Sequence, residues 1–332
     1  MIETPIVTKT FKLSDGTDIP AVGFGGMEYG MIFPDDQKAR VIETLKQALQ
    51  AGYRLIDTAR IYNTEDLVGA AIRASGIPRS EITVITKLVQ AHHDDPETSF
   101  NESLAKLDVD YIDIYLMHWP NALGADGQYK AIDQSPTFVE TWKKMEKLVG
   151  PRCRGLGVCN FSQKTMDVLL KECTIKPLVN QVEVHPYNPS LELVPYCLEK
   201  GIRVLSWGPV CGGPKSLYFD TSAMFNHPIL TSVASRYNIS VGLVILSWLV
   251  QRGLVPIPHS ASPTRMAENL RPVALTGEEV EQINNMHKHI GQKRLMDSVG
   301  IFWGETPGKG KTLMGWTVQE MGWEDAEGKV LI

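Results

Sequence analysis

Short apolar segments alternate with longer segments of helical pattern along most of this chain. Eight of the short segments are rich in β-branched and aromatic residues, and they cover residues 21–25, 54–58, 82–87, 111–118, 153–160, 178–185, 203–208 and 254–260. Between them apolar residues recur at helical spacing, as in 39–52, 136–149 and 241–251. This alternation predicts a parallel sheet with crossover helices, and a count of eight favours closure into a (β/α)8 TIM barrel over an open doubly wound sheet.

Parts of the chain lie outside this alternation. A short β-hairpin is expected at Thr8–Leu13, with its turn at Asp15 and Gly16. Residues 120–136 form a long polar loop, and residues 291–332 are rich in Gly and Trp without a strong period. We expect one domain over residues 1–332, with a barrel core at about 11–290 and the C-terminal loop and tail at 291–332 over the catalytic face. The tail from Gly304 onward fits a pocket lid, an interface arm or a disordered segment.

Composition narrows the function classes. The net charge is −5 and no basic stripe occurs, so nucleic-acid binding is disfavoured. The five cysteines are scattered without a CxxC pair, which indicates reduced thiols in a cytoplasmic protein. The N-terminus lacks the apolar segment of a signal peptide, and the stretch Val241–Val250 is shorter than the ~20 residues that span a bilayer. We expect no membrane association, and a monomer or weak homodimer.

Polar side chains end three consecutive predicted strands. Asp57 closes the second strand and Tyr62 follows in the same loop, while Lys87 ends the third strand and His118 the fourth. Each alone has an ordinary interpretation as a cap, core or surface residue, but barrel topology places all four on the rim where active sites form. A nearby Lys⁺ lowers a Tyr pKa because positive charge favours the phenolate. We therefore expect Asp57 to orient Lys87, and His118 to orient a carbonyl or relay a proton.

Six segments carry a family resemblance. They are GYRLIDTARIY (52–62), ITKL (85–88), LMHWP (116–120), GVCNF (157–161), NQVEVHP (180–186) and PIPHSASPTRMAENL (256–270), and in this order they resemble the motifs of the aldo-keto reductase family. The resemblance runs from about Phe11 to Ile290. It implies a barrel without a Rossmann fold that binds NADPH in extended form across its rim, and it makes Asp57, Tyr62, Lys87 and His118 the catalytic tetrad.

The same resemblance implies a set of cofactor contacts. Asn160 and Gln181 match the amides that hold the nicotinamide carboxamide, and Trp207 stands where an aromatic ring stacks on the nicotinamide. The remaining cofactor positions that it implies are Gly25, Gly26, Met27, Asp57, Cys159, Gly208, Pro209, Val210, His259, Ser260, Arg265, Glu268 and Asn269. Among these, Ser260, Arg265, Glu268 and Asn269 match the grip on the adenosine 2′-phosphate and adenine.

Several positions depart from the family pattern. Cys159 replaces the usual Ser, His259 replaces the usual Lys, and Pro214 stands roughly where an acidic residue would bridge to that Lys over the pyrophosphate. We therefore expect a looser hold on the cofactor and a narrower preference for NADPH. Met27 replaces a large aromatic residue and Gly26 a Thr, which predicts a roomier pocket on that side.

The leading hypothesis is an NADPH-dependent carbonyl reductase. Hydride would pass from nicotinamide C4 to a ketone or aldehyde, with Tyr62 as general acid. The substrate positions are Met27, Trp119, Phe302 and Trp303. The alternative is a non-catalytic NADP(H)-binding regulatory or channel-associated subunit on the same fold, for which Tyr62 beside Lys87 would have no use. The run from His92 to Asp95 indicates a solvated loop that caps the next helix, and no metal is expected.

Overall fold

The N-terminal hairpin precedes the barrel. The computed structural model describes residues 9–27, 34–325, 327 and 330–331. Strand β1 (Thr10–Lys12) pairs antiparallel with β2 (Asp18–Pro20), and Gly16 takes a φ of +87° in the turn between them. The predicted hairpin and turn are thus confirmed, although Thr8 lies outside the described residues.

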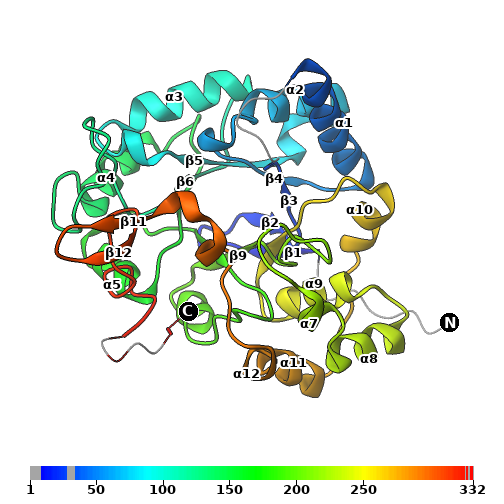
Figure 1. Ribbon diagram of the computed structural model, residues 1–332. Helices are drawn as coiled ribbons and strands as arrows, with labels where there is room; N and C mark the ends of the chain where they lie inside the picture. Colours follow the sequence, from blue (N-terminus) through cyan, green and yellow to red (C-terminus); the bar gives the residue numbers. More distant parts are fainter. Residues whose placement is uncertain (1–8, 28–33, 326, 328–329, 332) are drawn as a thin grey trace.

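Within the described residues, eight parallel strands follow one another in sequence order around the sheet (Figure 1). They are β3 (Phe24–Gly25), β4 (Leu55–Asp57), β5 (Thr83–Leu88), β6 (Ile114–Met117), β7 (Leu156–Cys159), β8 (Val179–Glu183), β9 (Arg203–Trp207) and β10 (Val255–Ile257). The two end strands are joined by the amide nitrogens of Gly23 and Gly25, which donate to the carbonyls of Pro256 (2.9 Å) and Pro258 (3.0 Å). These bonds close the sheet, so the predicted (β/α)8 barrel is confirmed.

Helices surround this barrel. They are α1 (Asp35–Ala51), α2 (Glu65–Ser75), α3 (Pro96–Leu107), α4 (Phe138–Met145), α5 (Gln163–Glu172), α6 (Leu193–Glu199), α7 (Ser222–Phe225), α8 (Pro228–Tyr237), α9 (Val241–Gln251), α10 (Pro263–Asn269), α11 (Gly277–Asn284) and α12 (His287–Ile290). The helix predicted at 39–52 begins four residues earlier, at Asp35, and buries Val41, Leu45, Ala48 and Leu49 as expected. The segment 136–149 folds as α4 followed by a 3₁₀ turn, η4 (Glu146–Leu148).

The hydrophobic core has two parts. One lies between the barrel and its helices. The other fills the barrel, where strand residues such as Leu55, Ile85 and Leu205 pack with Leu13 and Ile19 of the hairpin segment. Because the hairpin leads into the amino-terminal end of β3, it covers that end of the barrel. The hairpin therefore does not cover the carboxyl ends of the strands, where the active sites of such barrels form.

The C-terminal tail folds back onto the barrel loops. Strands β11 (Trp303–Thr306) and β12 (Gly310–Leu313) form an antiparallel hairpin, drawn in orange and red in Figure 1. Asn121 Nδ2 donates to the carbonyl of Met314 (3.1 Å), and Trp316 Nε1 donates to the carbonyl of Lys130 (2.9 Å). The tail therefore packs against the polar loop 120–136, and the interpretation of a disordered tail is wrong for its described residues.

None of the described helices is by itself long and apolar enough to cross a bilayer, although α8 and α9 pass that test as a pair bent by 91°. All five cysteines lie in described segments and are free thiols.

Candidate active site

A buried ion pair occupies the carboxyl end of the barrel. Lys87 is fully buried in β5, and Asp57 ends the neighbouring strand β4 with 5% of its surface exposed. Lys87 Nζ lies 2.9 Å from Asp57 Oδ1, 2.8 Å from Asp57 Oδ2 and 2.9 Å from the carbonyl oxygen of Thr58. Burial alone would lower the pKa of Lys87, but the Asp57 carboxylate raises it above its ordinary value. The ammonium is therefore charged and fixed in position.

Tyr62 and His118 complete the cluster. Tyr62 belongs to the 3₁₀ turn η1 (Arg60–Tyr62) after β4, and Lys87 Nζ lies 5.0 Å from the centroid of its ring. His118 directly follows β6, and its ring meets that of Tyr62 edge to face, with centroids 5.7 Å apart. The fold thus brings together the four side chains that the sequence placed on one rim.

Burial decides the protonation state of Tyr62. It raises the pKa of Tyr62 to about 12, although the charge of Lys87 acts in the opposite direction. The lowering effect expected of Lys87 is present, but a net lowering of the Tyr62 pKa is contradicted because desolvation of the phenolate is the larger effect. Tyr62 is protonated at neutral pH, as a proton donor has to be.

His118 is neutral. Burial, and then the positive charge of Lys87, hold the pKa of His118 well below its ordinary range. Its buried Nδ1 has no hydrogen-bond partner among the described residues. A neutral imidazole can donate one hydrogen bond to a carbonyl oxygen without adding a second positive charge.

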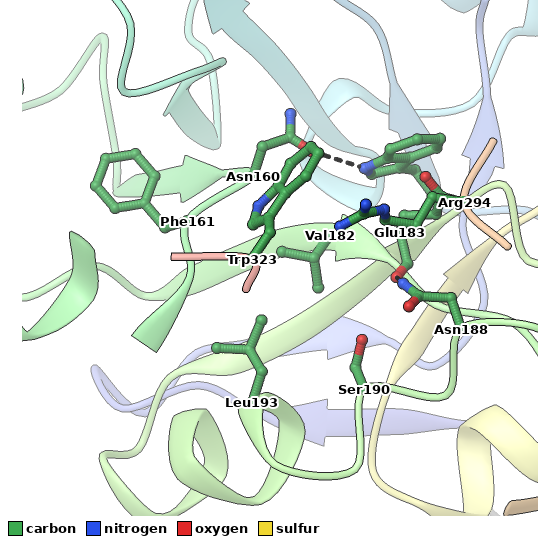
Figure 2. Close-up of a pocket in the computed structure, with 10 residues that line it drawn as sticks. Asn160, Phe161, Val182, Glu183, Asn188, Ser190, Leu193, Arg294 and Trp323 are labelled. Atoms are coloured by element: carbon green, nitrogen blue, oxygen red, sulfur yellow. Dashed lines mark hydrogen bonds between the residues drawn. The ribbon is translucent and has the colours of Figure 1, made fainter. Parts of the chain in front are cut away.

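The amides from β7 and β8 contact this cluster directly. Gln181 Nε2 donates to Asp57 Oδ1 (2.7 Å), and Asn160 Nδ2 donates to the carbonyl of His118 (3.0 Å). Trp207 Nε1, at the end of β9, donates to Asn160 Oδ1 (3.0 Å), which is the dashed line in Figure 2. The Cys159 thiol lies 3.8 Å from Gln181 Oε1. The proposed nicotinamide contacts therefore share a hydrogen-bonded network with the tetrad.

A second group of proposed cofactor residues lies around the end of β10. Ser260 Oγ accepts from Arg265 Nε (3.1 Å) at the start of α10, and Arg265 is exposed. His259 Nδ1 lies 2.8 Å from the carbonyl oxygen of Gly25, across the seam of the barrel. Glu268 accepts from the amide of Ser240 (3.0 Å), and Asn269 is buried.

Close packing explains two glycines of the predicted set. Gly26 donates its amide to the carbonyl of Asp57 (2.7 Å), and a Cβ at Gly26 would stand 3.0 Å from that oxygen. At Gly208 the φ is +60°, and a Cβ would lie 2.5 Å from Leu295. Pro209 and Val210 continue the same turn, while Met27 is 40% exposed.

The C-terminal tail places the proposed substrate residues in two different surroundings. Trp119 is only 2% exposed because Phe302 and Trp323 cover it, with ring centroids 6.5 Å and 6.1 Å away. Trp303 is held elsewhere, since its Nε1 donates to the carbonyl of Met296 (2.9 Å) and Lys311 Nζ stands 4.5 Å above its ring.

The sequence missed several of the residues that line a cavity together with Asn160 and Trp207 (Figure 2). The guanidinium of Arg294 lies 5.0 Å from the ring of Trp323, and Glu183 accepts from the amides of Leu295 and Met296. An acidic residue at a strand end could have drawn attention to Glu183. Arg294 and the tryptophan lie in the tail, where no period or motif marks them.

The His92–Asp95 segment differs in part from its interpretation as a solvated loop. Asp95 caps α3 by accepting from the amide of Thr98 (3.1 Å), as expected. His93, however, is 1% exposed, and burial lowers its pKa to about 3. The part of the chain that the structure describes contains no group of three or more His, Cys, Asp or Glu side chains that could hold a metal ion.

The sequence that forms this site matches the model of a known protein family. The model of the aldo/keto reductase family matches residues 21–288. The chain belongs to the aldo/keto reductase family. It is therefore an oxidoreductase that acts on carbonyl or alcohol groups, and the resemblance seen in the sequence is confirmed.

Other members of the family are similar over nearly their whole length. A glycerol 2-dehydrogenase (NADP(+)) of Saccharomyces cerevisiae is 36% identical over 308 residues, which is 87% of this chain and 94% of that one. A glyoxal reductase of Bacillus subtilis is 36% identical over 284 residues, 84% of this chain and 93% of that one. An aldo-keto reductase of Bombyx mori, solved in complex with NADP, has a TM-score of 0.76 and 34% identity, and covers 91% of this chain and 97% of its own.

Proposed function

We propose that this aldo/keto reductase reduces a ketone or aldehyde to an alcohol with NADPH, and that Tyr62 is the general acid. The observation that carries the proposal is the buried Lys87–Asp57 pair beside a protonated Tyr62 and a neutral His118. A charged lysine is costly to bury, and here it is held against a phenol at the end of the barrel where active sites form.

The donor set suits NADPH. Asn160 and Gln181 provide amides at the ends of β7 and β8, and Trp207 adds a flat ring beside them. Ser260 and Arg265 offer a hydroxyl and a guanidinium, the groups that bind a phosphate. The relatives that are named for NADP, or solved with it, support the same choice. When bound, the cofactor supplies the hydride.

The protein's own residues would manage the proton and the carbonyl. Tyr62 would donate its hydroxyl proton to the carbonyl oxygen, and the charge of Lys87 would stabilise the phenolate that remains. Asp57 would keep Lys87 charged and in place. His118 would donate a hydrogen bond to the same carbonyl oxygen and so orient the substrate.

Isotope transfer tests the proposal. The purified chain is mixed with an aromatic aldehyde and NADPH that carries deuterium at both C4 positions, and the alcohol is examined by mass spectrometry. We expect NADPH consumption and one deuterium on the alcohol carbon. NADPH binding without consumption over a panel of aldehydes and ketones would instead support the non-catalytic binding subunit, and the carbonyl reductase proposal would be withdrawn.

A further inference from the structure

The segment that carries Tyr62 forms a short loop whose two ends are joined by side chains. It runs from Thr58, which directly follows β4, to Thr64, which directly precedes α2. The chain turns at Asn63, whose φ of +53° lies in the left-handed region. The hydroxyl oxygens of Thr58 and Thr64 lie 3.0 Å apart, so a hydrogen bond closes the loop at its base. We call residues 58–64 the Tyr62 loop.

Thr64 occupies the N-cap position of α2, but its side chain does not cap that helix. Its carbonyl accepts the first helical bond, from the amide of Val68 (2.9 Å), whereas its hydroxyl accepts from none of the first-turn amides, all of which the structure describes. An N-cap threonine ordinarily accepts such a bond and thereby stabilises the helix. Thr137 and Thr276 do so at the starts of α4 and α11. The hydroxyl of Thr64 is therefore used for other contacts.

Those contacts connect two loops of the barrel rim. Thr64 Oγ1 donates to the carbonyl of Gly26, which follows β3 (3.0 Å). A hydroxyl has one proton, so Thr64 accepts the proton of Thr58 when it donates its own to Gly26. Both threonines are fully buried, where a hydroxyl without a partner is costly. The three groups thus form a directed chain of hydrogen bonds from Thr58 through Thr64 to Gly26.

Both ends of this chain bind the backbone or side chains of the buried ion pair. The carbonyl of Thr58 accepts from Lys87 Nζ (2.9 Å), and the amide of Gly26 donates to the carbonyl of Asp57 (2.7 Å). The residue between the two ends, Thr64, belongs to neither strand of the pair. Its hydroxyl therefore connects the start of α2 to the groups that hold the ammonium.

The start of α2 is itself fixed to the strand of Lys87. Glu65 is buried in the first turn of α2, and its Oε1 accepts from Thr86 Oγ1 (2.6 Å). Thr86 directly precedes Lys87 in β5. Because Thr64 directly precedes Glu65, its hydroxyl has a fixed place relative to the ammonium of Lys87. The end of the Tyr62 loop is thus anchored to the strand that supplies the catalytic charge.

We propose that Thr64 is a positioning residue for Tyr62: its hydroxyl closes the Tyr62 loop and so holds the phenol in its reactive place beside Lys87. This inference rests on the proposed function, because it takes Tyr62 as the proton donor. A displacement of about 1 Å can slow a positioned reaction by ~10²-fold. Loss of one of the bonds that hold the loop should therefore slow the chemical step measurably.

Single-turnover reduction of an aromatic aldehyde at saturating NADPH measures the chemical step. The wild type is compared with Thr64→Val, in which valine keeps the shape of threonine without its hydroxyl. We expect reduction to be about 10-fold slower in Thr64→Val, because the phenol is then less well placed. Thr64→Ser keeps the hydroxyl and should restore a rate near that of the wild type.

A double-mutant cycle with Tyr62→Phe separates positioning from a general loss of structure. If Thr64 acts by placing the phenol hydroxyl, it has nothing to place in Tyr62→Phe. Adding Thr64→Val to Tyr62→Phe should then change the residual rate by less than about twofold. A purely structural role would slow the reaction by the same factor in both backgrounds.

Thr141→Val is the matched control. Thr141 is another fully buried threonine, and its hydroxyl donates to the carbonyl of His93 (3.1 Å) in the helix layer. We expect a loss of thermal stability similar to that of Thr64→Val, with single-turnover reduction at the wild-type rate. If Thr64→Val fails to fold, Thr58→Val replaces it in both experiments, since it removes the bond that closes the loop and leaves Thr64 on Gly26. We expect about 3-fold slower reduction in Thr58→Val.

Two results would overturn the inference. One is a wild-type single-turnover rate in Thr64→Val, and the other is equal slowing by Thr64→Val in the wild-type and Tyr62→Phe backgrounds. Both leave the proposed function intact, since the wild type still reduces the aldehyde. A wild type that binds NADPH but reduces no aldehyde or ketone would instead refute the proposed function, and the inference with it.

Discussion

Two basic groups of the candidate site differ in their surroundings. Lys87 is fully buried in β5, and its ammonium donates hydrogen bonds to Asp57 and to the carbonyl of Thr58. Arg265 lies after β10, is exposed, and donates from Nε to Ser260. The buried group acts through a fixed charge in a medium of low polarity, whereas water and salt weaken the exposed one. We therefore expect the chemical step to depend on the buried centre and cofactor choice to depend on the exposed rim.

Lys87→Met should have a large effect on both turnover and stability. It removes the charge that stabilises the Tyr62 phenolate, so turnover should fall by at least about 10²-fold. It also leaves Asp57 buried without its counter-charge, which should lower the free energy of unfolding by ~3–5 kcal/mol. Steady-state rates and urea unfolding measure the two losses.

A double variant separates these losses. Lys87→Met with Asp57→Asn removes both charges, so stability should partly return while turnover stays low. Recovery of turnover together with stability would show that Lys87 contributes only to folding stability. The expectation that the chemical step depends on the buried centre would then be wrong.

Asp57→Asn should have a smaller effect, of about tenfold on turnover, because Lys87 remains. The negative charge of Asp57 raises the Tyr62 pKa, so its removal should lower that pKa. A general acid is active below its pKa and inactive above it. The alkaline limb of the kcat/KM profile for reduction should therefore move to lower pH. Asp297→Asn, at the carboxylate beside Arg294, is the control and should leave the limb in place.

The barrel half of the site was predictable because its signals are local. Parallel strands end on the same side of a barrel, so side chains at predicted strand ends, such as Asp57, Lys87 and His118, are expected on the same rim. The raised pKa of Tyr62 was not predictable, because it depends on burial by residues distant in the sequence. Charge alone gives the wrong sign for the net shift.

The tail was not predictable for a related reason. Its fold depends on contacts such as Phe302 with Trp119 and Trp316 with Phe138, which join residues more than 170 positions apart. No hydrophobic period marks such contacts in the sequence. Arg294 is buried in the same tail, so its position beside Asn160 in the lining of the cavity was equally unpredictable from the sequence.

On the exposed rim, Arg265→Ala should act on cofactor choice alone. Loss of a charge-assisted hydrogen bond of ~1.5–3 kcal/mol should reduce the preference for NADPH over NADH by roughly 10- to 100-fold, with turnover at saturation nearly unchanged. Fluorescence titration with both cofactors measures it, and Arg271→Ala, another exposed arginine just after α10, is the control. If the wild type binds NADH and NADPH equally, this rim does not hold the phosphate.

The smallest effect is expected from His259→Lys. A lysine at this exposed position adds a full positive charge near Ser260, which should raise NADPH affinity by about 2- to 5-fold at low salt and less at high salt. Titrations at two ionic strengths provide the measurement. An equal gain for NADH would place the new charge away from the 2′-phosphate.

Replacement of Tyr62 tests the central claim most directly. Tyr62→Phe deletes the proposed proton donor, and Tyr115→Phe deletes the hydroxyl of another buried tyrosine, which contacts Ser99 at 3.2 Å in the helix layer. Single-turnover reduction of an aromatic aldehyde by enzyme-bound NADPH should be ~10²–10⁴-fold slower in Tyr62→Phe, with NADPH affinity unchanged, and near the wild-type rate in Tyr115→Phe. A wild-type single-turnover rate in Tyr62→Phe would contradict the assignment of Tyr62 as the general acid.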